Sequence, residues 1–308
     1  MKNYTLVIHG GAGTILKSEM TSSKDNIYKI GLENALNEGF NVLKNNGSAL
    51  DAVTIAVAIL EDNPLFNAGK GSVYSSKGKH EMDASIMDGQ NLNAGAVCGI
   101  EGIKNPVKLA RLVMEKSNHV LLSGYGALEF AKEHGIQQLN DDYFHNSHRF
   151  EQWQRVKESD DFILDHTPNK ADKYGTVGAV ALDQNGNLAA ATSTGGMTNK
   201  KYGRIGDSPI IGSGNYANNK TCAISCTGSG EYFLRGVVAY DVSCLMEMKK
   251  LSLNEAAELT IHDRVKKIGG DGGLIAVDKD GNFALPFNTK GMYRGIKSKK
   301  GDYKVEIY

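Results

Sequence analysis

The sequence predicts a layered α+β fold, because its strand patterns come in hairpins and its helical patterns come in blocks between them. Polar turns that contain glycine mark two of the hairpins, at residues 184–187 and 279–282. Apolar residues recur with helical spacing over residues 25–46 and 50–60, two consecutive stretches with no strand between them. With 308 residues the chain is long enough to bury a large core, and we expect a single domain over residues 1–308.

The N-terminal half is expected to contain a strand, three helices and further hairpins. Gly47 is placed to end the first helix, and Ser48 is placed to cap the second. Asn105 and Pro106 favour the start of a third helix, because proline is tolerated in the first helical turn. The other elements expected here are a strand at residues 4–9, a glycine turn at 10–13, strands with hairpins at 71–99 and a helix at 107–116.

The C-terminal half follows a change in composition. Residues 145–174 carry many charges and few small apolar side chains, which favours a helix that runs into a mobile surface loop. A hairpin is expected to start directly afterwards, at Thr176. The other elements expected here are helices at residues 230–248 and 253–268 and a hairpin at 273–287.

The composition argues against several classes of protein. Lys and Arg together number 35, as do Asp and Glu, so the basic surplus typical of nucleic-acid-binding proteins is missing and a small molecule is the expected partner. Of the four cysteines only Cys222 and Cys226 lie close in sequence, which argues against a zinc site. The sequence starts without a secretory pattern and has no apolar run near the roughly 18 residues of a membrane helix. We therefore expect a cytoplasmic protein without a membrane partner.

Three threonines in glycine-rich surroundings, Thr176, Thr194 and Thr227, are the candidate nucleophiles. The sequence contains no Gly-x-Ser-x-Gly elbow, no His-Glu-x-x-His and no paired Cys–His arrangement. A threonine hydroxyl needs a neighbouring base, and one solution uses the threonine's own free α-amino group. Thr176 would gain that amine if the chain cut itself after Gly175, whose missing Cβ permits the unusual backbone geometry of such an attack. On residue type alone, however, an ordinary strand threonine is the more common case.

Seven short motifs cover nearly the whole chain and leave only residues 145–174 without a counterpart. They are HGGAG at 9–13, PLFNAGKGS at 64–72, MDASIMDG at 82–89, GIKNP at 102–106, GTVGAVALD at 175–183, STGGMTNKKYGRIGDSPIIGSG at 193–214 and CTGSGE at 226–231. In this order they resemble the isoaspartyl peptidase/L-asparaginase family, the plant-type, threonine-dependent asparaginases among the N-terminal-nucleophile hydrolases. Each motif alone is weakly specific, whereas the ordered set is very specific.

The resemblance implies a four-layer αββα sandwich and self-cleavage between Gly175 and Thr176. An α subunit of residues 1–175, ending in a mobile linker of about residues 157–175, and a β subunit of residues 176–308 would stay together as a dimer of such heterodimers. No catalytic metal or cofactor is implied. A structural sodium ion is implied on the backbone oxygens of Leu60, Glu61, Asn63, Phe66, Ala68 and Lys70.

The resemblance also implies the catalytic roles of individual residues. Thr176 would be the nucleophile and its own amine the general base, because an α-amine with a pKa of about 7.7 to 8.0 has a useful neutral fraction near neutral pH. Thr194 would orient the nucleophile, and Asn67 would lie close by. The Thr227 hydroxyl and the Gly228 N–H would form the oxyanion hole.

Arg204 and Asp207 would bind the two charges of an amino-acid headgroup. The Arg204 guanidinium can hold an α-carboxylate with two parallel hydrogen bonds, and the Asp207 carboxylate can hold an α-ammonium. Gly228 and Gly230 would leave room for that ammonium. The implied substrates are L-asparagine and β-aspartyl dipeptides, whose side-chain amide would be hydrolysed through a β-aspartyl ester on Thr176.

Three alternatives remain open at this point. A glycosylasparaginase of the same superfamily usually has His-Asp before its nucleophile, where this chain has Tyr174 and Gly175. A small-molecule kinase could use HGGAG as a phosphate loop, but no Gly-Lys-Ser/Thr follows, and the polar run SEMTSSKDN precedes the next helical pattern. The third alternative is an uncleaved, non-catalytic binder. On residue type alone, Arg204 and Asp207 are more commonly an exposed ion pair, and the role of Asn67 could be purely loop support.

Overall fold

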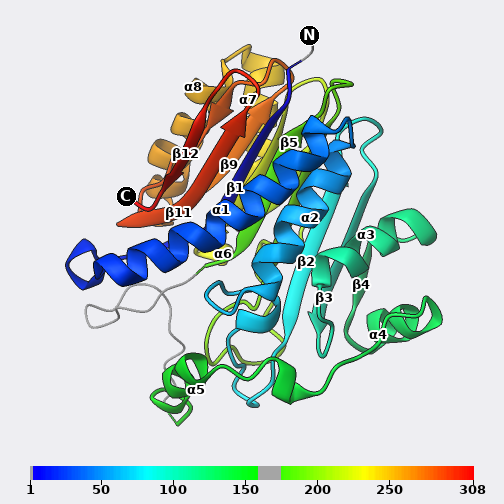
Figure 1. Ribbon diagram of the computed structural model, residues 1–308, viewed down its shortest axis with the longest axis vertical. Helices are drawn as coiled ribbons and strands as arrows, with labels where there is room; N and C mark the ends of the chain where they lie inside the picture. The colour runs from blue at the N-terminus through cyan, green and yellow to red at the C-terminus, as the bar shows by residue number, and fades with distance from the viewer. Residues whose placement is uncertain (1–2, 159–174) are drawn as a thin grey trace.

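The computed structural model describes residues 3–158 and 175–308 and contains two β-sheets in those parts (Figure 1). The strands of the larger sheet are β1 (Thr5–Gly13), β2 (Met82–Asp88), β3 (Ala94–Ile100), β4 (Leu121–Ser123), β5 (Val177–Leu182), β6 (Leu188–Thr194), β11 (Gly291–Ser298) and β12 (Tyr303–Glu306). Those of the smaller sheet are β7 (Asn215–Ala217), β8 (Cys222–Gly228), β9 (Gly272–Asp278) and β10 (Phe283–Ala284). Their orders are β12-β11-β1-β5-β6-β2-β3-β4 and β10-β9-β8-β7.

Helices cover the outer face of each sheet, so the described residues form four layers (Figure 1). The larger sheet packs against α1 (Ser22–Lys44), α2 (Ala49–Asp62) and α3 (Pro106–Lys116), and the smaller against α7 (Val238–Lys249) and α8 (Leu253–Glu258). The remaining helices are α4 (Gly124–Glu133), α5 (Ser147–Gln154) and α6 (Gly230–Gly236), with short 3₁₀ turns at Lys17–Glu19, Gly69–Gly71 and Asp141–Tyr143. This arrangement confirms the expected αββα sandwich.

The apolar core lies in three layers because strand side chains alternate between the two faces of a sheet. Leu6 and Ile8 of β1 pack under the helices of the larger sheet, whereas Val7 between them faces the smaller sheet. Every residue of β5 is buried, because this strand lies in the middle of the larger sheet with a layer on either side. The centre of the molecule is therefore a stack of strands closed to solvent on both faces.

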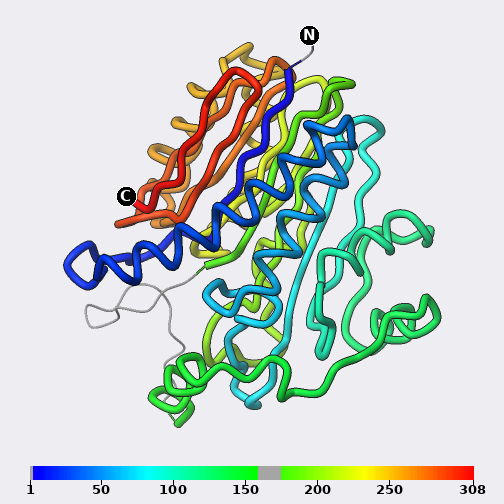
Figure 2. Tube along the Cα trace, viewed as in Figure 1, coloured from blue at the N-terminus to red at the C-terminus, as the bar shows by residue number. Residues whose placement is uncertain are grey.

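Segments far apart in the sequence lie side by side in the larger sheet. β1, near the N-terminus, pairs antiparallel with β11 from the C-terminal end and with β5 (Figure 2). β5 and β6 form the hairpin predicted around residues 184–187, in which Val177 pairs with Ser193 and Leu182 with Leu188. The hairpin thus brings the end of β6 back to the start of β5.

The helix signals were only partly correct. Ser48 caps α2 as predicted, since its hydroxyl accepts a hydrogen bond from the Asp51 N–H. Gly47 donates its N–H to the Val42 carbonyl, but the residue that turns left-handed after α1 is Asn46, with φ of 63°. Asparagine tolerates this conformation better than most residues because its short polar side chain can hydrogen-bond locally.

The predicted helix over residues 230–248 is broken into α6 and α7 by Val237. This valine has φ of 48° and ψ of 48°, a left-handed conformation that is rare for a β-branched residue. The helix predicted over residues 253–268 also changes character, because α8 continues as a π-helical segment at Leu259–Val265. Tertiary packing overrides local helix preference in both places.

Two further expectations need correction, and the described part of a third, the helix after residue 145, is confirmed. The first strand does not stop at residue 9 but continues through the glycines to Gly13, with a shift of register between His9 and Gly11. Within residues 71–99, the expected hairpin forms between β2 and β3, whereas residues 71–81 form no strand. The expected helix after residue 145 is α5, whereas most of the predicted linker, residues 159–174, lies outside the described residues.

Candidate active site

Thr176 and Thr194 lie side by side at one end of the β5–β6 hairpin. Val177–Ser193 is the last pair of the ladder at this end. Thr176 directly precedes Val177, and Thr194 directly follows Ser193. The Thr176 hydroxyl donates to Thr194 Oγ1 at 3.2 Å and lies 3.3 Å from Ser208 Oγ. Thr176 is only 7% exposed. The register of the hairpin therefore places the predicted nucleophile and its orienting threonine in direct contact.

Thr227 comes to the same place from the smaller sheet. It is fully buried near the end of β8, and its Oγ1 accepts the Ala12 N–H at 3.1 Å. A Cβ added to Gly175 would lie 2.6 Å from this Oγ1, which is closer than side chains tolerate. Thr227 thus sits against the residue that precedes Thr176, where an oxyanion donor for the Gly175 carbonyl would be needed.

Gly175 is also enclosed by the end of β1. A Cβ added to Gly11, which has φ of 114°, would lie 2.7 to 2.9 Å from three backbone atoms of Gly175. Gly11 is therefore required by the close approach of two backbones, and Gly175 by the Thr227 side chain. The sequence argument for Gly175 invoked attack geometry alone and did not anticipate this contact with the HGGAG segment.

Asn67 supports the segment that follows Thr194. Its Nδ2 donates to the Gly196 carbonyl at 2.7 Å, and its Oδ1 accepts the Val73 N–H at 3.1 Å. The Gly196 N–H in turn donates to Thr194 Oγ1 at 3.0 Å. Asn67 therefore lies close to the threonines, as expected, and acts on Thr194 through the intervening backbone.

Arg204 is held by Glu231, an interaction that the sequence argument missed. Arg204 Nε and Nη2 donate to the two Glu231 oxygens, both at 2.8 Å, in the parallel geometry that guanidinium and carboxylate favour. Burial alone would raise the pKa of Glu231, but the hydrogen bonds and charge of Arg204 outweigh it and lower that pKa. The acidic residue that follows the glycines of CTGSGE was the available signal, because it starts the helix beside the site.

Asp207 is buried beside Arg204, but the two side chains do not form the ion pair of the non-catalytic interpretation. Asp207 is 3% exposed, and its Oδ2 has no hydrogen-bond partner within the described residues. Burial raises the pKa of Asp207 to about 7, although the Arg204 charge opposes this. A Cβ added to Gly230 would lie 2.8 Å from Arg204 Nη2 and 2.9 Å from Asp207 Oδ1. Gly230 therefore borders both charged groups, as the sequence argument expected.

Gly228 lies where the smaller sheet passes into α6. Its φ of 151° and a Cβ position only 2.4 Å from the Asp271 carbonyl oxygen leave no room for a side chain. Gly228 directly follows Thr227, which carries the proposed oxyanion hydroxyl. The two proposed oxyanion donors therefore come from adjacent residues at the end of β8. The described residues thus bring all the predicted catalytic and substrate-binding residues to the adjoining ends of β5, β6 and β8.

Comparison with known proteins identifies the family. A family model described as Asparaginase matches residues 2–307. The chain belongs to the asparaginase family. An isoaspartyl peptidase of Escherichia coli (strain K12) is 48% identical to it over 316 aligned residues, covering 98% of both chains. A probable isoaspartyl peptidase/L-asparaginase 2 of Arabidopsis thaliana is 40% identical and covers 100% of both.

Membership of the asparaginase family confirms the resemblance and makes this chain a hydrolase. An isoaspartyl peptidase/L-asparaginase of Mus musculus is 44% identical over 96% of this chain and 88% of its own. The family model and the relatives named here do not support the kinase alternative. The fold also argues against it. HGGAG is the end of β1 in the middle of a sheet, not a loop that opens a helix.

The segment expected to hold sodium in this asparaginase-family chain folds tightly after α2. Four of its six carbonyls already accept one backbone N–H: those of Leu60, Asn63 and Phe66 from within the segment, and that of Ala68 from Gly71 just after it. A carbonyl has two lone pairs, so each can still contact a cation. The oxygen set suits a hard cation, and the site remains a proposal. The described residues contain no group of three or more His, Cys, Asp or Glu side chains that could hold a metal ion.

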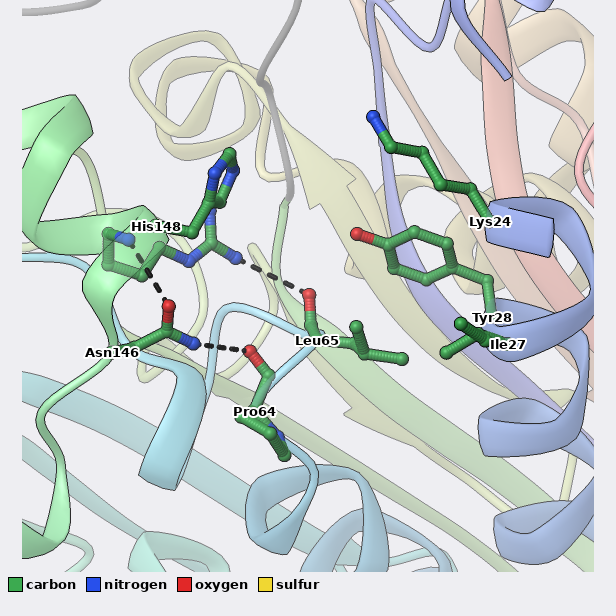
Figure 3. A pocket seen from close by; sticks show the side chains of 8 residues that line it. Lys24, Ile27, Tyr28, Pro64, Leu65, Asn146 and His148 are labelled. Carbon is green, nitrogen blue, oxygen red and sulfur yellow. Dashed lines mark hydrogen bonds between the residues drawn. The ribbon is translucent and has the colours of Figure 1, made fainter. Parts of the chain in front are cut away.

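A separate pocket of about 270 Å³ lies between α1, α5 and the start of this segment (Figure 3). Asn146 closes one side by donating to the Pro64 carbonyl, and Arg149 donates to the Leu65 carbonyl. Lys24 and Tyr28 approach from α1. None of the predicted catalytic or substrate-binding residues lines it within the described chain. No described helix is long and apolar enough to cross a membrane.

Proposed function

We propose that this chain cuts itself between Gly175 and Thr176 and then hydrolyses the side-chain amide of L-asparagine and of β-aspartyl dipeptides. The observation that carries the proposal is the contact of Thr176 Oγ1 with Thr194 Oγ1, with Gly175 pressed against Thr227. This geometry combines a positioned hydroxyl, a glycine carbonyl before it and a donor for the developing oxyanion. The names of the relatives support the choice of substrates.

Self-cleavage would begin with attack of Thr176 Oγ1 on the Gly175 carbonyl carbon. The C–N bond breaks, the nitrogen takes up a proton, and an ester joins Gly175 to the threonine oxygen. Water then hydrolyses this ester and leaves a carboxylate on Gly175 and a free amine on Thr176. Thr227 Oγ1 already accepts the Ala12 N–H, which leaves its own proton free to donate to the oxyanion.

Substrate hydrolysis would repeat these steps at the β-amide. The Thr176 amine takes the hydroxyl proton, Oγ1 attacks the amide carbon, and the Thr227 hydroxyl and Gly228 N–H stabilise the oxyanion. Ammonia or an amino acid leaves with the proton. Water hydrolyses the β-aspartyl ester and regenerates Thr176. The oxyanion donors typically contribute about 3 to 4 kcal/mol each to the transition state.

The substrate headgroup would lie between Arg204 and Asp207. Glu231 engages the Nε N–H and one N–H of Nη2 of Arg204, so the edge formed by Nη1 and the second N–H of Nη2 is left for an α-carboxylate. The unpartnered Oδ2 of Asp207 is available to the α-ammonium. An α-ammonium therefore completes the hydrogen bonding of the buried Asp207 carboxylate, while an α-carboxylate on the same headgroup would pair with Arg204.

The pH dependence of binding tests the Asp207 assignment. Asp207 binds an ammonium only when ionised, and its pKa of about 7 in the free site means that it becomes protonated as the pH falls below that value. The inhibition constant of the product L-aspartate should therefore rise about tenfold per pH unit below pH 7 and level off above it. Protonation of the Thr176 amine would instead affect turnover, because this amine is the proposed general base. An inhibition constant that stays flat from pH 5 to pH 8 contradicts the assignment.

The two pieces are proposed to stay together after cleavage. β1 of the first piece pairs with β11 and β5 of the second, and β2 of the first pairs with β6 of the second, so separation would break three ladders of one sheet. A dimer of such heterodimers and a structural sodium ion on the segment from Leu60 to Lys70 are part of the same proposal. Sedimentation with and without sodium checks both.

A side-by-side assay tests the substrate proposal. Ammonia release from L-asparagine and amino-acid release from a β-aspartyl dipeptide are measured on the same cleaved preparation. Hydrolysis of both is expected, since they share the headgroup that Arg204 and Asp207 would bind. A cleaved chain that hydrolyses neither would refute the proposed function.

A further inference from the structure

A layer of polar side chains lies directly beneath the proposed catalytic threonines. Thr192 precedes Thr194 by two residues on β6, and Ser225 precedes Thr227 by two on β8, so each pair shares the face between the sheets. The next side chains along the same face are apolar: Val7, Val180, Ala190 and Ala223. Along each of these strands, the side chains on this face therefore change from apolar to polar two residues before the proposed catalytic threonine.

The polar layer is a continuous chain of hydrogen bonds across four strands. His9 Nε2 lies 2.9 Å from Ser225 Oγ, which lies 2.7 Å from Thr192 Oγ1. Thr192 donates to the Gly214 carbonyl at 3.1 Å and accepts from Asn215 Nδ2 at 3.2 Å. The four side chains, from β1, β8, β6 and β7, are completely buried.

Gly178 leaves room for these hydrogen-bonded side chains because it has no side chain of its own. It pairs with His9 on one side and with Thr192 on the other. A Cβ on Gly178 would lie 2.0 Å from Ser225 Oγ and 2.4 Å from His9 Nε2. The missing side chain lets Ser225 of the smaller sheet reach two strands of the larger one. The absence of a Cβ two residues after Thr176 thus serves the polar chain.

His9 connects the layer to the backbone of Thr176. Burial lowers the pKa of His9 to about 3, an effect that its interaction with the Thr176 backbone opposes, so the ring is neutral in the assay range. Nε2 is engaged by Ser225, and Nδ1 has no hydrogen bond of normal geometry within the described residues. The nitrogen left for the Thr176 backbone is therefore Nδ1.

We propose that His9, Ser225 and Thr192 are positioning residues, whose hydrogen-bonded layer fixes Thr176 and Thr194 in the geometry that hydrolysis requires. Apolar side chains of the same size would fill this layer without the cost of burying polar groups. The polar chain instead ties β1, β8 and β6 to one another immediately beneath the reacting hydroxyl. The inference rests on the proposed function and extends it beyond residues that would touch the substrate.

Thr192→Val tests the proposal, because valine keeps the shape of threonine and removes its hydroxyl. We expect kcat for L-asparagine, per mole of free N-terminal Thr176, to fall by about tenfold, the equivalent of one hydrogen bond of typical strength. KM should stay within about twofold, since Arg204 and Asp207 are untouched. Thr192→Ser, which restores the hydroxyl, should recover most of the lost rate.

Two further variants separate positioning from stability. Thr221 lies six residues before Thr227, and its buried hydroxyl forms a hydrogen bond with that of Ser243. Thr221→Val removes this hydroxyl and should lower the melting temperature without changing kcat. The double variant Thr192→Val/Ser225→Ala should be no slower than the slower single variant, because both substitutions break one chain of hydrogen bonds.

A kcat of Thr192→Val equal to that of the wild type overturns the inference. A decrease in kcat that is just as large in Thr192→Ser overturns it too. If Thr192→Val does not fold, Ser225→Ala decides in the same way, with a tenfold loss supporting the inference and an unchanged kcat refuting it. Failure of the proposed function is distinguishable, because the cleaved wild type would then hydrolyse neither substrate.

Discussion

Replacing Thr176 with alanine is expected to leave the chain in one piece and to abolish hydrolysis. The substitution removes the oxygen that would attack both the Gly175 carbonyl and the substrate amide. Loss of a nucleophile typically costs about 10⁴-fold or more in kcat. Gel electrophoresis and ammonia release from L-asparagine measure the two effects on one preparation.

Thr176→Ser is the matched control for this variant. Serine keeps the hydroxyl that contacts Thr194 and Ser208, so this variant should still cleave itself and hydrolyse substrate, although more slowly. Cleavage of Thr176→Ala after residue 175 would show that another group performs the attack and would refute the mechanism.

Replacing Arg204 with alanine is expected to separate self-cleavage from substrate hydrolysis. Cleavage needs the groups around Gly175 and should proceed, whereas the α-carboxylate of the substrate loses its partner and Glu231 is left unpaired. Removing one partner of a hydrogen-bonded charge pair between protein and ligand typically costs about 2 to 5 kcal/mol, so kcat/KM should fall by about 30- to 5,000-fold. Steady-state kinetics on the cleaved variant measures this loss.

Arg111 provides a matched control arginine. It also binds carboxylates, those of Asp51 and Glu115 at 2.7 Å, and its side chain is about as exposed as that of Arg204. Arg111 belongs to α3, which lies in the helical layer that covers the larger sheet. Arg111→Ala should therefore change the free energy of unfolding and leave KM unaltered. An Arg204→Ala enzyme with the KM of the wild type would refute the carboxylate role.

Features set by local pattern could be predicted from the sequence. The hairpin turn at residues 184–187 fixes the register of β5 and β6, and that register alone brings Thr176 to Thr194. The Ser48 cap depends only on residues three positions apart. Gly230 could be assigned beside Arg204 and Asp207 because the family motifs place all three.

Features set by contacts between distant segments could not be predicted. Glu231 reaches Arg204 only because α6 packs beside the loop that carries Arg204, so the acidic end of CTGSGE could be noticed in the sequence but not paired with Arg204. The contact of Gly11 with Gly175 likewise requires β1 to lie against the cleavage junction. Val237 contradicts local preference, since a valine within a helical pattern gives no sign that it will turn left-handed. Ser208 beside Thr176 carried no signal at all.

Denaturing mass spectrometry of the purified chain, with sequencing of the new N-terminus, tests the central claim most directly. The account predicts two fragments, residues 1–175 and residues 176–308, with Thr176 as the free N-terminal residue of the second. An uncleaved chain that hydrolyses β-aspartyl dipeptides, or an active chain whose new N-terminus lies elsewhere, would contradict it.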